Sequence, residues 1–323
     1  MKDSIFHKFI IFDLKSILGI FLSVLCIWWA FKDFELSSFL SILLEIKISY
    51  LLLATFLLWI SVWLRSFRWQ YLFQPDKIPN IFLLYRSEMI GHFVNNILPL
   101  RLGELFRVYI INKDLQISKS YVLGTIVLER LLDLVLFLFF SIIFIIISPY
   151  RHYLSKNFLW LVFFISIFIM FIFLISKFIG GMKNKTWFLN NLEQIISGVK
   201  SIRFEAIFPI ILLSIMIWFI YLINIYLLQL AFDFNLDFIK ILMVLVFSFM
   251  AIGVPAAPGM VGTYHAAVKF AVVDLLGFSS VQGSTFALVS HAYGYIFLTL
   301  IGLYYFIKNQ FASGLISRIV RER

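Results

Sequence analysis

The sequence predicts an all-α membrane protein with about six transmembrane spans and two broken, re-entrant helical hairpins. Hydrophobic residues make up 62% of the 323 residues and charged residues only 14%, whereas soluble domains carry about 25% charge. The mean hydropathy is +0.99. Several apolar runs approach the roughly 20 residues that a helix needs to cross a bilayer. A membrane barrel would instead show short alternating strands. A polytopic helical protein follows.

The six predicted spans lie in uninterrupted apolar runs. The first follows a basic stretch, as in a signal peptide, but Trp28, Trp29 and Phe31 stand where a cleavage site needs small residues. We therefore expect an uncleaved span. Polar loops are expected between spans one and two and across 177–203. The spans are 17–31, 50–64, 121–148, 158–179, 207–232 and 285–307.

Two weaker apolar segments are interrupted by proline and glycine. The first, 81–100, is predicted to stop at Pro99, with a short helix over 102–112. In the second, 241–254 ends in Pro255–Ala256–Ala257–Pro258–Gly259, and 260–276 follows. Pro99 and Gly103 are four residues apart, as are Pro258 and Gly262, and each lies 159 residues from its counterpart. Such breaks in two halves indicate a transporter-type site at mid-membrane. The predicted halves are 1–150 and 151–323.

The distribution of basic residues predicts the orientation. If the hairpins are re-entrant, each half crosses three times and the two halves are inverted. Twenty lysines and arginines then fall on the side of both termini and five on the other. The positive-inside rule places both termini on the cytoplasmic side. We expect the protein to lie in the cytoplasmic membrane. Topology and anionic head groups explain the net charge of +10 better than nucleic acid does.

Asn95 to Arg107 is the stretch with the most charge in apolar surroundings. Arg101, Glu104 and Arg107 are spaced i, i+3 and i+6, so a helix would make both arginines neighbours of Glu104. We predict an Arg-Glu-Arg cluster whose surplus charge binds a phosphate. The break at Pro99 would turn a helix N-terminus toward the same anion. The alternative is a cytoplasmic loop with arginines at the head groups.

A second charged group, Glu129, Arg130 and Asp133, lies inside the span over 121–148. Charges there are expected to face the bundle interior and to pair. The group carries one net negative charge, which we expect to meet Arg101 or Arg107. A substrate role and a purely structural salt bridge are both open.

Further polar residues offer weaker candidates. His265 and His291 could relay protons, because histidine titrates near neutral pH, or serve only packing. Asn95 and Asn96 could satisfy the broken helix. The sequence has no Gly-rich phosphate loop, no His-Glu-x-x-His motif and only one cysteine, Cys26. We therefore predict no cofactor, no metal and no catalytic residue.

Three segments resemble the lysylphosphatidylglycerol synthase transmembrane region, a flippase-like family also designated UPF0104. They are 96–107, with Asn96, Pro99, Arg101, Gly103, Glu104 and Arg107; 129–133; and 255–265, with Pro258, Gly259, Gly262 and His265. Many relatives have a second glycine where Met260 stands here and an acid roughly at His265. The resemblance implies a membrane protein that handles anionic or polyprenyl-phosphate lipids. It does not imply lysyl transfer, because the synthase domain of fused relatives has no counterpart here.

The sequence thus predicts a translocator of an anionic lipid or lipid-linked intermediate. Its predicted substrate-binding residues are those of the three segments together with Glu129, Arg130 and Asp133. The alternatives are a membrane enzyme acting on a lipid phosphate, with Glu104 or His265 as acid or base, and an accessory subunit of a lipid-modifying complex.

Overall fold

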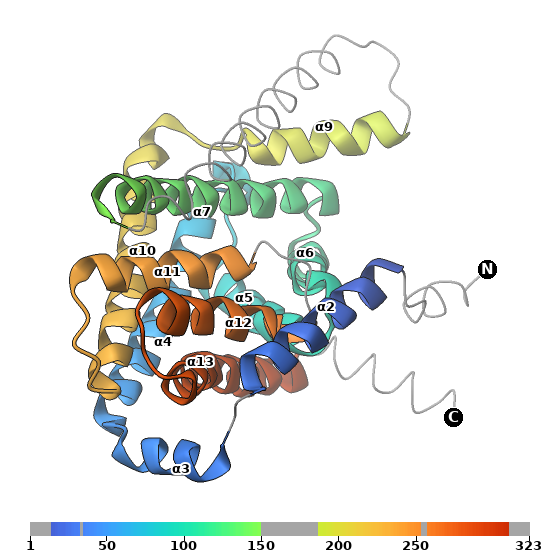
Figure 1. Ribbon diagram of the computed structural model, residues 1–323. Helices are drawn as coiled ribbons and strands as arrows, with labels where there is room; N and C mark the ends of the chain where they lie inside the picture. Colours follow the sequence, from blue (N-terminus) through green and yellow to red (C-terminus); the bar gives the residue numbers. More distant parts are fainter. Residues whose placement is uncertain (1–13, 33–34, 150–186, 253–256, 310–323) are drawn as a thin grey trace, which may run out of the picture.

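The protein is a bundle of helices (Figure 1), seen here in a computed structural model that describes residues 14–32, 35–149, 187–252 and 257–309. No strand occurs within these ranges. The first half contains α2 (Leu14–Phe31), α3 (Leu36–Glu45), α4 (Ile48–Tyr71), η1 (Pro75–Lys77), α5 (Ile81–Ile97), η2 (Pro99–Arg101), α6 (Gly103–Leu115) and α7 (Lys119–Ile147). The second contains α9 (Trp187–Val199), α10 (Phe204–Ala231), α11 (Phe238–Ile252), η4 (Pro258–Met260), α12 (Thr263–Lys269), the π-helical turn η5 (Phe270–Leu275) and α13 (Ser280–Lys308).

Four of the described helices, α4, α7, α10 and α13, are long and apolar enough to cross a membrane. They match the predicted spans 50–64, 121–148, 207–232 and 285–307. The predicted first span forms α2, which is shorter in its apolar part, and the span over 158–179 lies outside the described residues. Large apolar side chains such as Phe204 (85% exposed) and Phe208 (75%) point outward. A lipid-facing surface accounts for them, and the protein is a multi-pass helical membrane protein.

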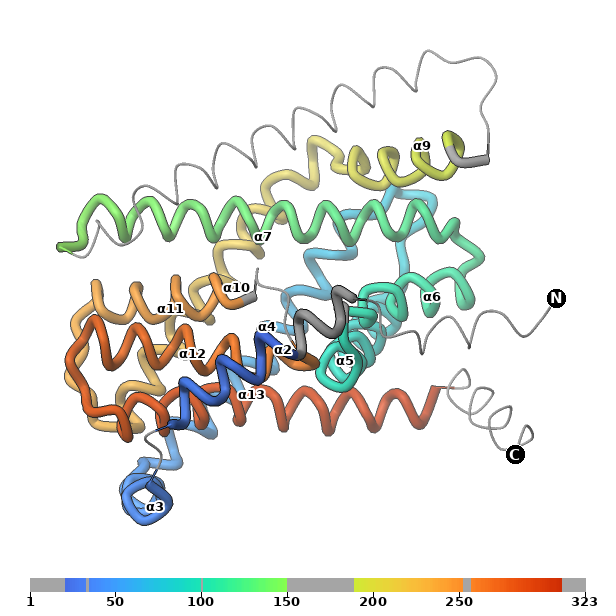
Figure 2. The backbone as a smooth tube through the Cα atoms, turned by 45° about the vertical axis from the view of Figure 1, so that its right-hand side comes forward, coloured from blue at the N-terminus to red at the C-terminus, as the bar shows by residue number. Residues whose placement is uncertain are grey.

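The helical hairpins occupy opposite ends of the bundle (Figure 2). The pair α5–α6 lies at the end where α7 begins, and the pair α11–α12 lies at the end where α10 finishes. Each hairpin packs against the long helix that follows the other one: α5 against α13, and α11 against α7. The helices α4 and α10 pack against each other between them. The two breaks, η2 and η4, meet inside the bundle.

The predicted break at Pro99 follows the expected chemistry. Helix α5 ends at Ile97, Pro99 opens the turn η2, and α6 begins at Gly103. Proline has no N–H to continue the ladder and disfavours a helical residue before it. The second break begins at Pro258 in the same way. Pro255 and Ala256 lie outside the described residues.

Two segments expected to be polar loops contain helices. Between the first two spans lies α3, and within 177–203 lies α9. In α9 the apolar residues Leu189, Leu192 and Ile196 recur at helical spacing, a signal that the net charge of the segment obscured. Helix α9 packs on α7, where Gly124 and Gly198 let the backbones approach: a Cβ on Gly124 would lie 2.1 Å from Ile195 O.

Candidate functional site

Seven charged side chains from four helices form a buried ionic cluster inside the bundle. Helix α4 supplies two arginines, α5 and α6 supply one residue each, and α7 supplies three. The members are Arg65, Arg68, Glu88, Arg107, Glu129, Arg130 and Asp133. We call them the ionic cluster.

Glu129 is the centre of the ionic cluster. Its Oε1 lies 2.5 Å from Arg65 Nη2 and 2.7 Å from Arg130 Nη2, and its Oε2 lies 2.6 Å from Arg107 Nη2. The carboxylate is fully buried. Burying an isolated charge costs roughly several kcal/mol of desolvation free energy. The three guanidinium groups offset this cost for the Glu129 carboxylate.

The other two acids of the ionic cluster each hold a different arginine. Glu88 Oε1 lies 2.6 Å from Arg107 Nη2, and Asp133 Oδ1 lies 2.7 Å from Arg68 Nη2. Arg107 also stacks on the ring of Trp69, with its Cζ 4.0 Å from the ring centroid. Such a stack suits guanidinium, which is planar and weakly hydrated. The cluster therefore joins α4, α5, α6 and α7 by geometrically defined contacts.

The ionic cluster holds four arginines against three carboxylates. Arg130 is the cluster's exposed cation: it pairs with Glu129 and Asp133, but its side chain is 38% exposed whereas that of Arg107 is 4% exposed. Arg101 lies within electrostatic range of Arg130 and of Glu104. Two cationic side chains with exposed surface thus flank the first break.

The predicted Arg-Glu-Arg arrangement is wrong for Arg107, whereas Arg101 does lie within electrostatic range of Glu104. Arg101 belongs to η2 rather than to α6, with a left-handed φ of +53°, so the i, i+3 spacing does not apply. Arg107 turns away from Glu104 toward Glu88 and Glu129. Glu104 accepts a hydrogen bond from Asn95 Nδ2 at 3.4 Å. The expectation that the α7 acids meet Arg101 or Arg107 is confirmed for Glu129 and Arg107.

Asn95 satisfies the start of α6. Its Oδ1 accepts from the Gly103 N–H at 2.7 Å, one of the unpaired N–H groups of a helix N-terminus. Gly103 is needed for the close approach of α5 and α6, because a Cβ there would lie 2.1 Å from Gly91 O. These contacts hold the start of α6 in place, directly after the turn that contains Arg101.

A second polar group lies where the two breaks meet. Asn96 Nδ2 donates to Thr299 Oγ1 at 2.8 Å, and the Tyr295 hydroxyl donates to Asn96 O at 3.0 Å. Near them His291 Nε2 lies 2.8 Å from Gly259 O, and the ring centroid of His265 lies 4.8 Å from that of His291. Pro258, Gly259, Gly262 and His265 therefore belong to a group distinct in its contacts from the ionic cluster.

Sequence reasoning missed three members of the ionic cluster. Arg65 and Arg68 close an apolar run with nearby tryptophans, which favours an interfacial position, but the structure buries both. Glu88 is one of several polar residues in the moderately apolar segment 81–100, so nothing in the sequence singled it out. One signal was available: Arg65 and Arg68 are spaced i, i+3 and Glu129 and Asp133 i, i+4, so each pair shares one helix face.

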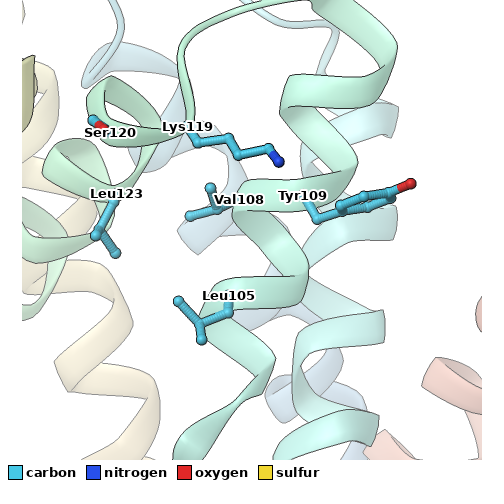
Figure 3. A pocket seen from close by; sticks show the side chains of 6 residues that line it. All are labelled: Leu105, Val108, Tyr109, Lys119, Ser120 and Leu123. Atoms are coloured by element: carbon cyan, nitrogen blue, oxygen red, sulfur yellow. The ribbon is translucent and has the colours of Figure 1, made fainter. Parts of the chain in front are cut away.

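An apolar groove lies between α6 and α7 (Figure 3). Leu105, Val108 and Leu123 line it, and Lys119 and Tyr109 stand at its edge. Lys119 Nζ lies 5.9 Å from the centroid of the Tyr109 ring. No group of three His, Cys, Asp or Glu side chains that could hold a metal ion occurs in the described part of the chain.

The fold and the ionic cluster define a multi-pass helical membrane protein with paired charges inside its bundle. The model of the lysylphosphatidylglycerol synthase TM region matches residues 16–302, and the protein belongs to this family. The chain is 32% identical over 134 residues to UPF0104 membrane protein MJ1595 of Methanocaldococcus jannaschii, covering 40% of this chain and 39% of that protein. It is 28% identical over 203 residues to UPF0104 membrane protein MJ1078 of the same organism, covering 59% of this chain and 82% of that protein. No solved structure matches.

Proposed function

We propose that this protein translocates an anionic lipid, a phospholipid or a polyprenyl-phosphate intermediate, across the cytoplasmic membrane. The observation that carries the proposal is the surplus positive charge of the ionic cluster beside a broken helix. Arg101 and Arg130 bind the phosphate, while Arg107 is neutralised by Glu88 and Glu129 and holds the helices in place. This changes the role of Arg107 from the one the sequence predicts.

The strained backbone of Arg101 supports its role. A left-handed φ in a residue with a Cβ costs about 1–2 kcal/mol, and such strain persists where the surroundings impose it, often at functional sites. Two neighbours constrain the backbone of Arg101: Pro99 opens the same turn, and the Gly103 N–H after the turn is held by Asn95. These constraints place Arg101 in the turn at the break rather than in α6.

The arrangement of the hairpins supports a path through the bundle. The helices of the two halves correspond in order: α4 to α10, α5 to α11, α6 to α12 and α7 to α13. If each helix is exchanged for its counterpart, the contact of α5 with α13 becomes the contact of α11 with α7, which is also present. The same exchange maps α6–α7 onto α12–α13. We propose that this exchange reflects two inverted halves with re-entrant hairpins, and in such folds the substrate site lies where the broken helices meet. Both termini then face the cytoplasm.

The apolar groove supplies a surface for the lipid chain. It is formed by α6 and α7, and Leu105 follows Arg101 by four residues. A head group at Arg101 and Arg130 and a hydrocarbon chain along Leu105, Val108 and Leu123 would fit one lipid molecule. The charged part then crosses inside the bundle while the chain stays in contact with the membrane.

The test is lipid translocation by the purified full chain in vesicles of phosphatidylethanolamine and phosphatidylglycerol. A fluorescent phosphatidylglycerol reports on transfer between leaflets, and a fluorescent phosphatidylcholine tests the preference for anions. We expect Arg101→Ala to slow transfer by about tenfold or more, because a charge-assisted hydrogen bond is worth about 1.5–3 kcal/mol. Arg101→Lys should retain part of the rate.

Arg86→Ala is the matched control. Arg86 lies on the same hairpin and pairs with Asp114 at 2.5 Å, away from the ionic cluster. It should translocate like the unmodified protein. If Arg101→Ala translocates at the same rate as Arg86→Ala, Arg101 has no part in the mechanism. If the unmodified chain moves neither lipid, the proposed function is wrong.

A further inference from the structure

Residues on one face of α13 form hydrogen bonds with both helix breaks. His291, Tyr295 and Thr299 are spaced i, i+4 and i+8, so they share that face. His291 Nε2 lies 2.8 Å from Gly259 O in the second break. Tyr295 donates to Asn96 O, and Thr299 accepts from Asn96 Nδ2, at the end of α5. A change at the second break is therefore transmitted to a helix that also contacts the first.

The hydrogen bonds assign a role to one nitrogen of each histidine ring. Gly262 N–H donates to His265 Nδ1 at 3.2 Å, so Nδ1 carries no proton. His291 Nε2 faces the carbonyl of Gly259, which can only accept, so Nε2 carries one. A neutral imidazole has one donor and one acceptor. This arrangement therefore fits two neutral rings.

Apart from the Gly259 carbonyl on His291, no described group that contacts the pair would stabilise a positive charge. Helix α12 contributes Tyr264, whose hydroxyl donates to Ser290 of α13, and Lys269, whose ammonium donates to Ala30 O. Helix α2 contributes Phe31, α13 contributes Tyr295, and α5 contributes a backbone carbonyl. Among the described residues no carboxylate pairs with either ring. His265 is only 3% exposed, and its Nε2 has no hydrogen-bond partner in the described part of the chain.

We infer that His265 and His291 form a proton-binding pair whose protonation opens the second break. A proton on His265 Nδ1 turns that atom into a donor facing the donor N–H of Gly262, and the hydrogen bond is lost. The same proton places a charge in a buried site beside a second histidine. The closed arrangement is thus the deprotonated one, favoured at higher pH, and it opens as the pH falls. Only the link to lipid movement rests on the proposed function: the pair would couple translocation to a proton gradient.

Hydrogen exchange of the Gly262 amide tests the pair without any transport assay. The purified full chain is compared at about pH 7.5 and about pH 5, on either side of the usual histidine pKa, with correction for intrinsic exchange. We expect the protection of residues 259–265 to fall about fivefold at the lower pH, because local opening follows the loss of this hydrogen bond. Unchanged protection would overturn the inference.

Two variants isolate the titrating groups. His265→Asn places Oδ1 where Nδ1 stood, so it can accept from Gly262 N–H but cannot be protonated near neutral pH. We expect its protection to be the same at both pH values. His291→Gln keeps a donor to Gly259 O. Its exchange should still respond to acid through His265. An acid response that survives His265→Asn would overturn the inference.

Magnetic resonance of the imidazole carbons covers the case in which His265→Asn does not fold. The chain has five histidines, and His291→Gln identifies one signal of the pair. In the unmodified chain both rings should report the same two macroscopic titration steps, as coupled groups do. A His265 signal that does not titrate would overturn the inference. Titration without lipid transfer would leave the proton site standing and refute the proposed function.

Discussion

Arg107 Nη2 lies 2.6 Å from Glu129 Oε2, and the same nitrogen lies 2.6 Å from Glu88 Oε1. One guanidinium of α6 therefore joins α5 to α7. The indole of Trp69 on α4 covers the flat side of that guanidinium. Arg107 thus contacts three other helices, and its side chain is the point at which the first hairpin is held in the bundle.

Replacing Arg107 should therefore destabilise the protein strongly. Arg107→Ala would leave Glu88 and Glu129 buried with one partner fewer, and removing one member of a buried ion pair costs about 3–5 kcal/mol. Thermal unfolding in detergent, followed by tryptophan fluorescence, measures the effect. Arg86→Ala removes an arginine from the same hairpin, but the side chains of Arg86 and Asp114 are about one third exposed. Its effect should stay below about 1 kcal/mol. Equal losses for the two variants would contradict the assignment.

The sequence predicted the helices better than it predicted the contacts. Uninterrupted apolar runs located α4, α7, α10 and α13, and proline located both breaks, because hydrophobic length and the missing N–H act locally. The ionic cluster is not local. Arg65 and Glu129 are far apart in the chain and meet only because α4 and α7 pack together. A charged residue near the end of an apolar run has the same sequence signature whether it faces head groups or a buried partner.

The error at Arg107 has a different origin. Helical spacing placed Arg107 beside Glu104 within α6, but Arg107 pairs instead with acids on α5 and α7. Periodicity states which residues share a face. It does not state what that face meets. The Glu129–Arg107 contact could be expected because net charge in a membrane must be balanced.

Helix α9 should depend on the glycine contact with α7. A Cβ at Gly124 would lie 2.1 Å from Ile195 O and 2.9 Å from Gly198 Cα, so Gly124→Ala must push α9 away. We expect faster trypsin cleavage after Lys200 and Arg203, which follow α9. Gly294→Ala is the control, because its Cβ would meet only the flexible end of Leu58, at 3.2 Å. Unchanged cleavage in Gly124→Ala would show that α9 tolerates the displacement.

The ion pair between Lys47 and Asp233 should contribute weakly and only below strongly alkaline pH. The Lys47 ammonium lies 2.8 Å from Asp233 Oδ1, and this hydrogen bond raises the pKa of Lys47 above its ordinary value of 10.5. A raised pKa means that the stabilisation is complete below the ordinary value and is lost as the pH rises through the raised one. Lys47→Gln should lower the unfolding temperature slightly at neutral pH. The difference should vanish in strong alkali and shrink in salt, because the pair is exposed. A difference that persists in both would point to a role other than charge.

Gly259 and Gly262 should respond differently to the same substitution. Both have left-handed backbones, with φ of +63° and +97°, so alanine is strained at each, by about 1–2 kcal/mol. The steric conflicts differ. A Cβ at Gly259 would lie 2.4 Å from Tyr295 Cε2, a side-chain atom, whereas a Cβ at Gly262 would lie 2.3 Å from the backbone oxygen of Ser23.

Removing the side chain of Tyr295 therefore separates the two cases. Tyr295→Ala should partly restore the stability of Gly259→Ala, because it removes the clash and leaves the backbone strain. It should not restore Gly262→Ala, since the Ser23 carbonyl remains in place. Unfolding temperatures of the single and double variants form the measurement. Equal rescue at both positions, or none at either, would mean that Tyr295 does not pack on the second break as the structure shows.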